Sequence, residues 1–113
     1  MTQAIFGTDV TSILSQWKAG LLTNAQVHEW ATDRYAVVAW EPEDGAVNEV
    51  LACLDVMDMN LVTVEDVAAL LAALGQETAE AAAEAMGAYQ DTVDLAARKR
   101  RLADEPFYSR FCK

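Results

Sequence analysis

The sequence predicts an all-α fold, a compact antiparallel bundle of about five helices in which the last helix is long. Over most of the 113 residues, apolar side chains recur at spacings of three and four, which places them on one face of a helix. Residues that cap helix starts precede these segments, and Gly or Pro follows most of them. No segment combines the period-two alternation and the turn chemistry of strands. We therefore expect helices joined by short loops into a single domain, residues 1–113.

The first helix is expected to begin at Thr8 or Asp9, because both residues are good N-caps. It should run to Ala19, since Gly20 suits the left-handed position that stops a helix. Its buried face is formed by apolar residues at helical spacing: Val10, Ile13, Leu14 and Trp17.

The second helix is expected to follow Thr23, which forms a capping box with Gln26. The apolar spacing continues far enough to predict a helix that ends at Glu41. There the following Pro42 pushes the chain out of helical geometry. The residues on its apolar face are Val27, Trp30, Ala31, Tyr35 and Val38.

A third helix should begin near Glu43 or Asp44, whose charges favour the N-terminal end of the helix dipole. The fourth should open at Thr63, with Asp66 three residues later as a second capping pair, and end at Gly75. The apolar stripe of the third helix is Val47, Val50, Leu51, Leu54 and Met57, and that of the fourth is Val67, Leu70, Leu71 and Leu74.

The fifth helix is predicted to be long, because Thr78 can cap it and nothing obvious stops it before Pro106. About 25 residues would span roughly 38 Å. Its inner seam is Ala82, Ala85, Met86, Tyr89, Val93 and Ala96. The basic end of this helix and the tail, residues 98–113, include three aromatic residues that we expect to pack back on the body.

Charge is distributed unevenly along the chain. Residues 1–97 carry sixteen acids and two bases, a net charge of -14, whereas residues 98–113 carry six bases and two acids, a net charge of +4. Such a body repels nucleic acid and anionic membranes and attracts cationic partners. A high negative charge that simply maintains solubility is the alternative interpretation.

The N-terminal residues lack the pattern of a signal peptide, and the longest apolar runs are too short to span a membrane. We therefore expect a cytoplasmic protein with no membrane partner. Its two cysteines, Cys53 and Cys112, do not make a disulfide framework, and Cys53 fits a helical pattern as a small buried residue.

No combination of residues predicts catalysis or a cofactor. The single histidine, His28, precedes Glu29, but the second histidine of a zinc-protease motif would fall at Thr32. A calcium-loop frame that starts at Asp55 puts methionines where oxygen ligands must stand. We therefore expect a non-enzymatic protein that needs no metal and no cofactor.

Two groups of charged residues are the candidates for partner binding. The acidic group flanks the turn between the third and fourth helices and consists of Asp55, Asp58, Glu65 and Asp66. The basic group ends the fifth helix and consists of Arg98, Lys99, Arg100 and Arg101. Such a basic run suits nucleic acid or an acidic partner. A structural role is the alternative, because bases at a helix C-terminus complement its dipole and have acids of the same chain to face.

One part of the sequence resembles the opening of small bacterial immunity proteins of the colicin-immunity type. The resemblance covers residues 8–75 in pattern. The residues that carry it are Leu14-x-x-Trp17-x-x-Gly20-x-Leu22-Thr23 and then Val27-x-x-Trp30-Ala31. It implies a compact helical antidote that masks a basic toxin surface with carboxylates. The basic helix end departs from a wholly acidic binding face.

These observations lead to a first hypothesis of an acidic, non-enzymatic binding protein with a cationic protein partner, in its specific form a toxin-neutralising antidote. The alternative is a structural or adaptor protein that self-associates through the long helix and the aromatic tail. A nucleic-acid accessory protein that uses the basic run is third, because so acidic a body disfavours nucleic acid as a partner.

Overall fold

The computed structural model describes residues 2–113, and most of its regular structure is helical. The α-helices of this part of the chain are α1 (Gly7–Lys18), α2 (Asn24–Thr32), α3 (Gly45–Asp55), α4 (Val67–Leu74), α5 (Ala79–Gln90) and α6 (Leu95–Leu102). There are also two 3-10 turns in residues 2–113. η1 (Val64–Asp66) directly precedes α4, and η2 (Ser109–Phe111) lies near the C-terminus. The radius of gyration is 13.8 Å, close to the value of about 13 Å for a compact chain of this length. The expectation of a compact, mainly helical chain is confirmed.

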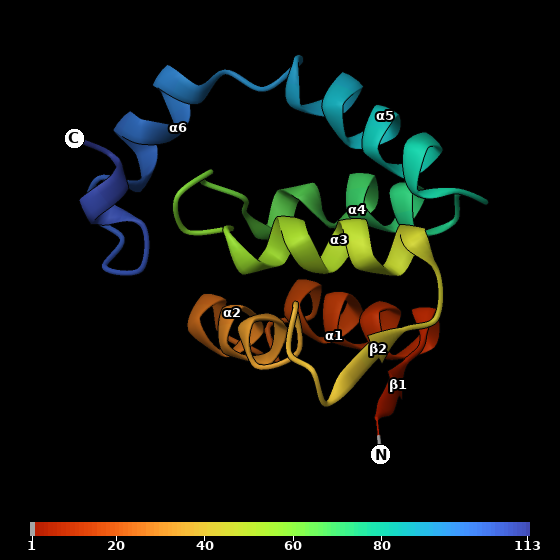
Figure 1. Ribbon diagram of the computed structural model, residues 1–113. Coiled ribbons are helices and arrows are strands. Elements are labelled where there is room, and N and C mark those ends of the chain that lie inside the picture. The colour runs from red at the N-terminus through yellow and green to blue at the C-terminus, as the bar shows by residue number, and fades with distance from the viewer. Residues whose placement is uncertain (1) are drawn as a thin grey trace.

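The helices form three tiers (Figure 1). α1 and α2 lie at the bottom of the view, α3 and α4 in the middle, and α5 and α6 arch over them. α3 is the centre of the core, because it contacts α1, α2, α4 and α5. The whole apolar stripe expected on the third helix is buried: Val47, Val50, Leu51, Leu54 and Met57.

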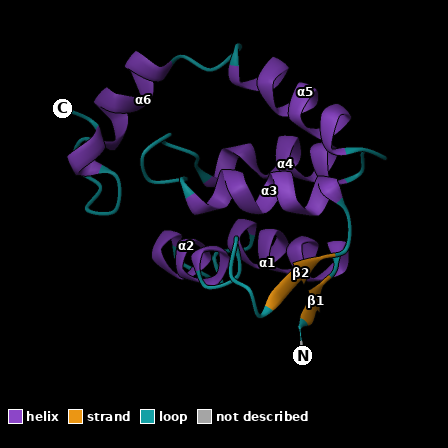
Figure 2. Cartoon of the chain, in the orientation of Figure 1, coloured by secondary structure: helices purple, strands orange, loops and turns teal. Residues whose placement is uncertain are grey.

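A two-stranded parallel sheet joins the N-terminus to the segment before α3 (Figure 2). β1 (Gln3–Ile5) pairs with β2 (Trp40–Pro42), with Ile5 opposite Pro42. The expectation that no segment is a strand is therefore wrong. Strands of three residues are too short to show an alternating pattern, and this pair is held by the burial of Ile5 and by the Glu43 N–H, which donates to the Ile5 carbonyl at 2.8 Å.

The second helix is shorter than predicted and ends at Thr32. The next residues form turns, and Val38, expected on a buried face, is 91% exposed. The guanidinium of Arg34 stacks on the rings of Trp30 and Trp40, 4.6 and 4.7 Å from their centroids. A helix would place two residues ten positions apart about 15 Å from each other along its axis. The stacking therefore requires the chain to turn back, which also delivers β2 to β1.

The long fifth helix is also wrong, because α5 ends at Gln90 and a separate helix, α6, begins at Leu95. Polar side chains account for the break. The Thr92 hydroxyl donates to the carbonyl of Tyr89 at 2.6 Å, and the Asp94 carboxylate accepts from the N–H of Ala97 at 3.0 Å. Such side chains compete with the backbone bonds of a continuing helix, and Asp94 acts as the N-cap of a new one.

The starts of α2, α3 and α5 follow the predicted capping chemistry, whereas Thr63, expected to open the fourth helix, precedes the 3-10 turn η1, and α4 begins only at Val67. The Thr23 hydroxyl accepts from the N–H of Gln26, and the Gln26 amide oxygen accepts from the N–H of Thr23. Asp44 caps α3 and Thr78 caps α5 through one bond each, since the Asp44 carboxylate accepts from the N–H of Val47 and the Thr78 hydroxyl from that of Ala81. α1 differs, because it begins at Gly7, so the expected caps Thr8 and Asp9 lie inside the helix, and the Asp9 carboxylate accepts from the N–H of Phe6.

The C-terminal tail packs back on the body as expected. Tyr108 is buried, and its hydroxyl donates to the carbonyl of Val62 at 2.5 Å. Phe107 packs against the core and contacts the ring of His28 edge to face. Within residues 2–113, no helix is both long enough and apolar enough to cross a bilayer.

Candidate functional site

Asp66 is the centre of the most connected polar cluster in the structure. It ends η1, directly before α4, and is only 3% exposed. The fold places it there because Thr63 opens this turn and donates its N–H to the Asp66 carboxylate at 2.8 Å. The carboxylate thus caps the turn, as the sequence predicts, but most of its hydrogen bonds come from elsewhere.

Arg98, on α6, binds this carboxylate through both terminal nitrogens, each at 2.6 Å. One of these nitrogens also donates to the carbonyl of Leu61 at 3.1 Å. Leu61 is buried and has a φ of 54°, in the left-handed region that leucine rarely adopts. The geometry of the turn before α4 is therefore coupled to the position of α6.

Tyr89, near the end of α5, donates its hydroxyl to the same carboxylate, so three elements meet at Asp66. Burial opposes ionisation of Asp66, but hydrogen bonds from Arg98, Tyr89 and the Thr63 N–H outweigh it, and the pKa of Asp66 lies below its usual value. The same pair raises the pKa of Arg98, and the hydrogen bond to Asp66 raises that of Tyr89. At neutral pH the cluster is an ion pair with a neutral phenol.

Two further ion pairs surround this cluster. Glu65 pairs with Arg101, and both side chains are about half exposed. Asp58 is buried and lies 3.5 Å from the guanidinium of Arg110 in the tail. His28 donates its Nε2 proton to the Asp55 carbonyl at 2.9 Å, because a carbonyl oxygen can only accept. The turn between α3 and α4 is thus tied to α6 and to the tail.

The structure divides the charged residues singled out from the sequence. It brings together Asp66 with Arg98 and Glu65 with Arg101, and it places Asp58 beside Arg110. The side chain of Asp55 at the end of α3 takes part in no ion pair within residues 2–113. Lys99 and Arg100 are exposed, and neither has an acidic partner in the described part of the chain. Two of the four bases, Arg98 and Arg101, are therefore paired with acids of the same chain, and the other two are exposed and unpaired within residues 2–113.

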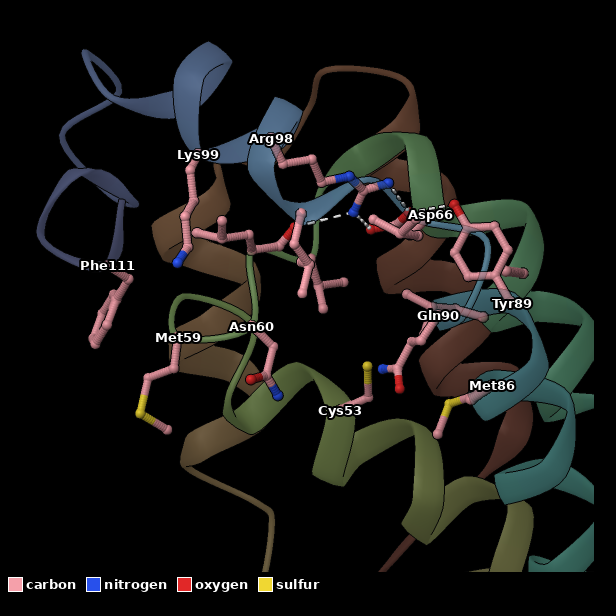
Figure 3. Close-up of a pocket in the computed structure, with 16 residues that line it drawn as sticks. Cys53, Met59, Asn60, Asp66, Met86, Tyr89, Gln90, Arg98, Lys99 and Phe111 are labelled. Atoms are coloured by element: carbon pink, nitrogen blue, oxygen red, sulfur yellow. Dashed lines mark hydrogen bonds and ion pairs between the residues drawn. The ribbon is translucent and has the colours of Figure 1, made fainter. Parts of the chain in front are cut away.

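A cavity of about 410 Å³ lies beside this cluster, between the arch of α5 and α6 above and α3 with the start of α4 below (Figure 3). Most of its lining is apolar: Cys53, Met59, Leu61, Val62, Ala69, Leu70, Met86, Val93, Leu95 and Phe111. Its polar lining is Asn60, Asp66, Tyr89, Gln90, Arg98 and Lys99.

Sequence reasoning missed this cavity and the roles of Tyr89 and Gln90. Met86, Tyr89 and Val93 were expected on the inner seam of one straight helix, where they would have packed directly on the body. The local signals of the break were Thr92 and Asp94, which have no neighbouring Gly or Pro to mark the end of a helix. The break leaves α6 bound to the rest chiefly through its ion pairs and η2, and residues of α6 line one side of the cavity.

The thiol of Cys53, which lines the cavity, is uncharged at neutral pH. Burial, and then the negative charge of Asp66, raise the pKa of the Cys53 thiol to about 11, so the thiol is protonated. No group of three His, Cys, Asp or Glu side chains within residues 2–113 is placed to hold a metal ion. The arrangement is suited to holding a ligand or a neighbouring element in place.

Comparison with protein-family models, with curated protein sequences and with solved structures finds no match for this chain.

Proposed function

We propose that this chain is a non-enzymatic acidic binding protein that docks on a cationic surface of a partner protein. The observation that carries the proposal is that most of the carboxylates are exposed and take part in no ion pair within residues 2–113. Of eighteen carboxylates, three are in ion pairs and Glu49 and Asp55 are half-buried, which leaves thirteen exposed and in no ion pair within residues 2–113. Three of the eight bases, Arg98, Arg101 and Arg110, are in ion pairs with carboxylates, and Arg34 stacks on Trp30 and Trp40.

Five of the thirteen exposed carboxylates gather at one end of the molecule. Gly45 at the start of α3 lies against Ala79 at the start of α5, so close that a Cβ on the glycine would lie 2.6 Å from the Cβ of Ala79. This contact brings together the acids that precede or open the two helices. We call this group the acidic end, and it consists of Glu41, Glu43, Asp44, Glu77 and Glu80.

Three of the four exposed bases that are in no ion pair within residues 2–113 lie at the other end, and the fourth, Lys18, ends α1. Lys99, Arg100 and Lys113 belong to α6 and the C-terminus, far from the starts of α3 and α5 along a molecule 42 Å in its longest dimension (Figure 1). Such a separation orients the chain in the field of a charged partner, with the acidic end first. Electrostatic attraction of this kind raises the association rate and weakens with salt.

In its specific form the proposal is a toxin-neutralising antidote, as the resemblance to colicin-immunity proteins implies. An antidote of this class acts by covering a basic surface with carboxylates and needs no catalytic group. The alternative of self-association rested on a long helix and an aromatic tail. That helix is broken, and Tyr108 of the tail is buried in its own chain.

Co-expression with the product of the adjacent reading frame, followed by a pull-down, tests the proposal. We expect a basic protein to be captured, with an association rate that falls between low and high salt. The triple variant Glu41→Gln, Glu77→Gln and Glu80→Gln should slow association. No hydrogen bond or ion pair within the described residues uses these side chains.

A matched control removes the same charge elsewhere: Glu29→Gln, Asp33→Asn and Asp104→Asn, all exposed and outside the acidic end. This variant should associate at nearly the wild-type rate. Failure to capture a partner from that locus, or binding that is indifferent to salt, would contradict the proposal. Equal slowing by both triple variants would refute docking through the acidic end.

A further inference from the structure

We infer that the cavity beneath α5 and α6 binds a small amphipathic anion, an apolar chain that carries one carboxylate. This inference concerns a different surface from the acidic end and does not depend on docking with a cationic protein. It rests on the size of the cavity, on the character of its lining, and on the single unpaired charge at its side.

The size and lining fit a small ligand. A volume of about 410 Å³ falls in the range of roughly 300–1,000 Å³ typical of small-molecule sites. Cys53 of α3 lies at the floor of the cavity (Figure 3), and Leu70 of α4, Met86 of α5 and Val93 of the following loop also line it. The protonated Cys53 thiol adds no negative charge to this floor. An apolar chain of the ligand would be removed from water on all these sides.

The charged groups of the lining favour a ligand with a negative charge. Asp66 and Arg98 neutralise each other, so their pair adds no net charge to the lining. Lys99 is the only other charged residue there, and within residues 2–113 it has no ion-pair partner. Figure 3 shows its ammonium pointing down from α6 toward the side where Met59 and Asn60 lie. A carboxylate of the ligand would be the missing partner of this ammonium.

The amides of Asn60 and Gln90 point into the cavity in the same view and offer further hydrogen-bond donors to a carboxylate. The net charge of -10 does not prevent the approach of an anion. At 0.1 M salt, charges more than about 10 Å apart are largely screened. The acidic end lies at the far end of the molecule, whereas Lys99 is at the cavity itself.

Titration calorimetry with sodium decanoate, below its micelle concentration, tests the inference on the full chain. We expect one decanoate per chain and weaker binding of decylammonium, which has the same apolar chain and the opposite charge. Lys99→Gln should weaken decanoate binding about fivefold, the loss expected for one partly exposed ion pair. Arg100→Gln, which removes the same charge from an exposed neighbour outside the cavity, should leave it unchanged.

A second variant tests the apolar part. Ala69→Leu adds bulk on the α4 side of the cavity and should abolish binding, with circular dichroism to check that the chain folds. Backbone amide NMR shifts upon addition of decanoate to the wild type give an answer that needs no variant. We expect them at Ala69, Met86 and Gln90, and not at the second hollow beside Trp30 and Trp40.

Each of three results would overturn the inference. One is the absence of heat and of amide shifts with decanoate at millimolar concentration. Another is decylammonium binding as tightly as decanoate. The third is a set of shifts confined to the hollow beside Trp30 and Trp40. None of these results bears on capture of a cationic protein by the acidic end, so the two proposals can fail separately.

Discussion

Arg98 binds Asp66 across 32 residues of chain through two hydrogen bonds of 2.6 Å. The pair is nearly enclosed, with side-chain exposures of 11% for Arg98 and 5% for Asp66. It joins α6 to the start of α4, and the Tyr89 hydroxyl ties the end of α5 to the same carboxylate. The position of α6, and therefore the cavity beneath it, depends on this contact.

Asp66→Asn should lower the free energy of unfolding by about 3 kcal/mol, because it leaves the enclosed guanidinium without its charge partner. Arg98→Met should lower the free energy of unfolding by a similar amount, because it leaves the enclosed Asp66 carboxylate without its charge partner. Their double variant should lose less than the sum of the two, since the pair interacts directly. Urea unfolding followed by circular dichroism measures all four chains.

The half-exposed pair of Glu65 and Arg101 provides the control for this prediction. Glu65→Gln should cost at most about 1 kcal/mol, because exposed ion pairs are screened by water and salt. Equal losses in Asp66→Asn and Glu65→Gln would show that enclosure of the Arg98 pair has no energetic consequence.

Asp66 also makes stability depend on pH in the acid range. Its folded pKa lies below the value of about 3.9 for an unperturbed aspartate. Between these two values the unfolded chain holds a proton that the folded chain has released, so the free energy of unfolding rises with pH. The contribution is complete above pH about 5, where the unfolded aspartate is ionised, and is lost as the pH falls through the folded pKa.

Urea unfolding at a series of pH values from neutral to strongly acidic checks this. Other carboxylates also titrate, so the informative quantity is the difference between the wild type and Asp66→Asn. We expect that difference to be constant above pH about 5 and to shrink below it. A difference that stays constant down to the lowest pH would contradict the depressed pKa.

The parts of this fold that were predictable from sequence are those set by local chemistry. Thr23 and Thr78 indicate the starts of α2 and α5, because their hydroxyls accept from backbone N–H groups three residues later. The stripe of α3 is predictable because its apolar residues recur at helical spacing and so share one face, which the structure buries against the neighbouring helices. These signals lie within a few residues of the structure that they specify.

The features that were missed depend on contacts between distant residues. Nothing near Asp66 indicates that its partner is Arg98, and nothing in residues 33–39 indicates that Trp40 returns to stack on Arg34. The break after α5 had a local signal in Asp94, but the direction that α6 then takes is set by the ion pair. The cavity follows from that direction, so no pattern in the sequence could reveal it.

The approach of α3 to α5 predicts opposite effects for two glycines. Gly45→Ala should destabilise the protein by about 1–3 kcal/mol, because its Cβ would lie 2.6 Å from the Cβ of Ala79 and 3.1 Å from its backbone. Gly87→Ala should stabilise it by up to about 1 kcal/mol. Gly87 lies inside α5, and nothing lies within 4 Å of the position where its Cβ would be. Thermal unfolding of the two variants distinguishes these signs, and a loss of stability in both would contradict the open space at Gly87.

The thiol at the floor of the cavity should react slowly. With a pKa of about 11, Cys53 has a thiolate fraction at pH 8 about two hundred times smaller than an ordinary cysteine of pKa about 8.5, and alkylation follows the thiolate. In the variant Cys112→Ser, where Cys53 is the only cysteine, iodoacetamide should label the folded chain far more slowly than the chain unfolded in urea. Mass spectrometry measures both rates.

The pH dependence separates the raised pKa from simple shielding. Between pH 8 and pH 10 the thiolate fraction of a group with a pKa of about 11 grows nearly in proportion to hydroxide, whereas that of an ordinary thiol saturates. The labelling rate of folded Cys112→Ser should therefore keep rising through pH 10 while the fold, followed by circular dichroism, stays intact. A rate that levels off near pH 9 would show that burial hinders the reagent without changing the pKa.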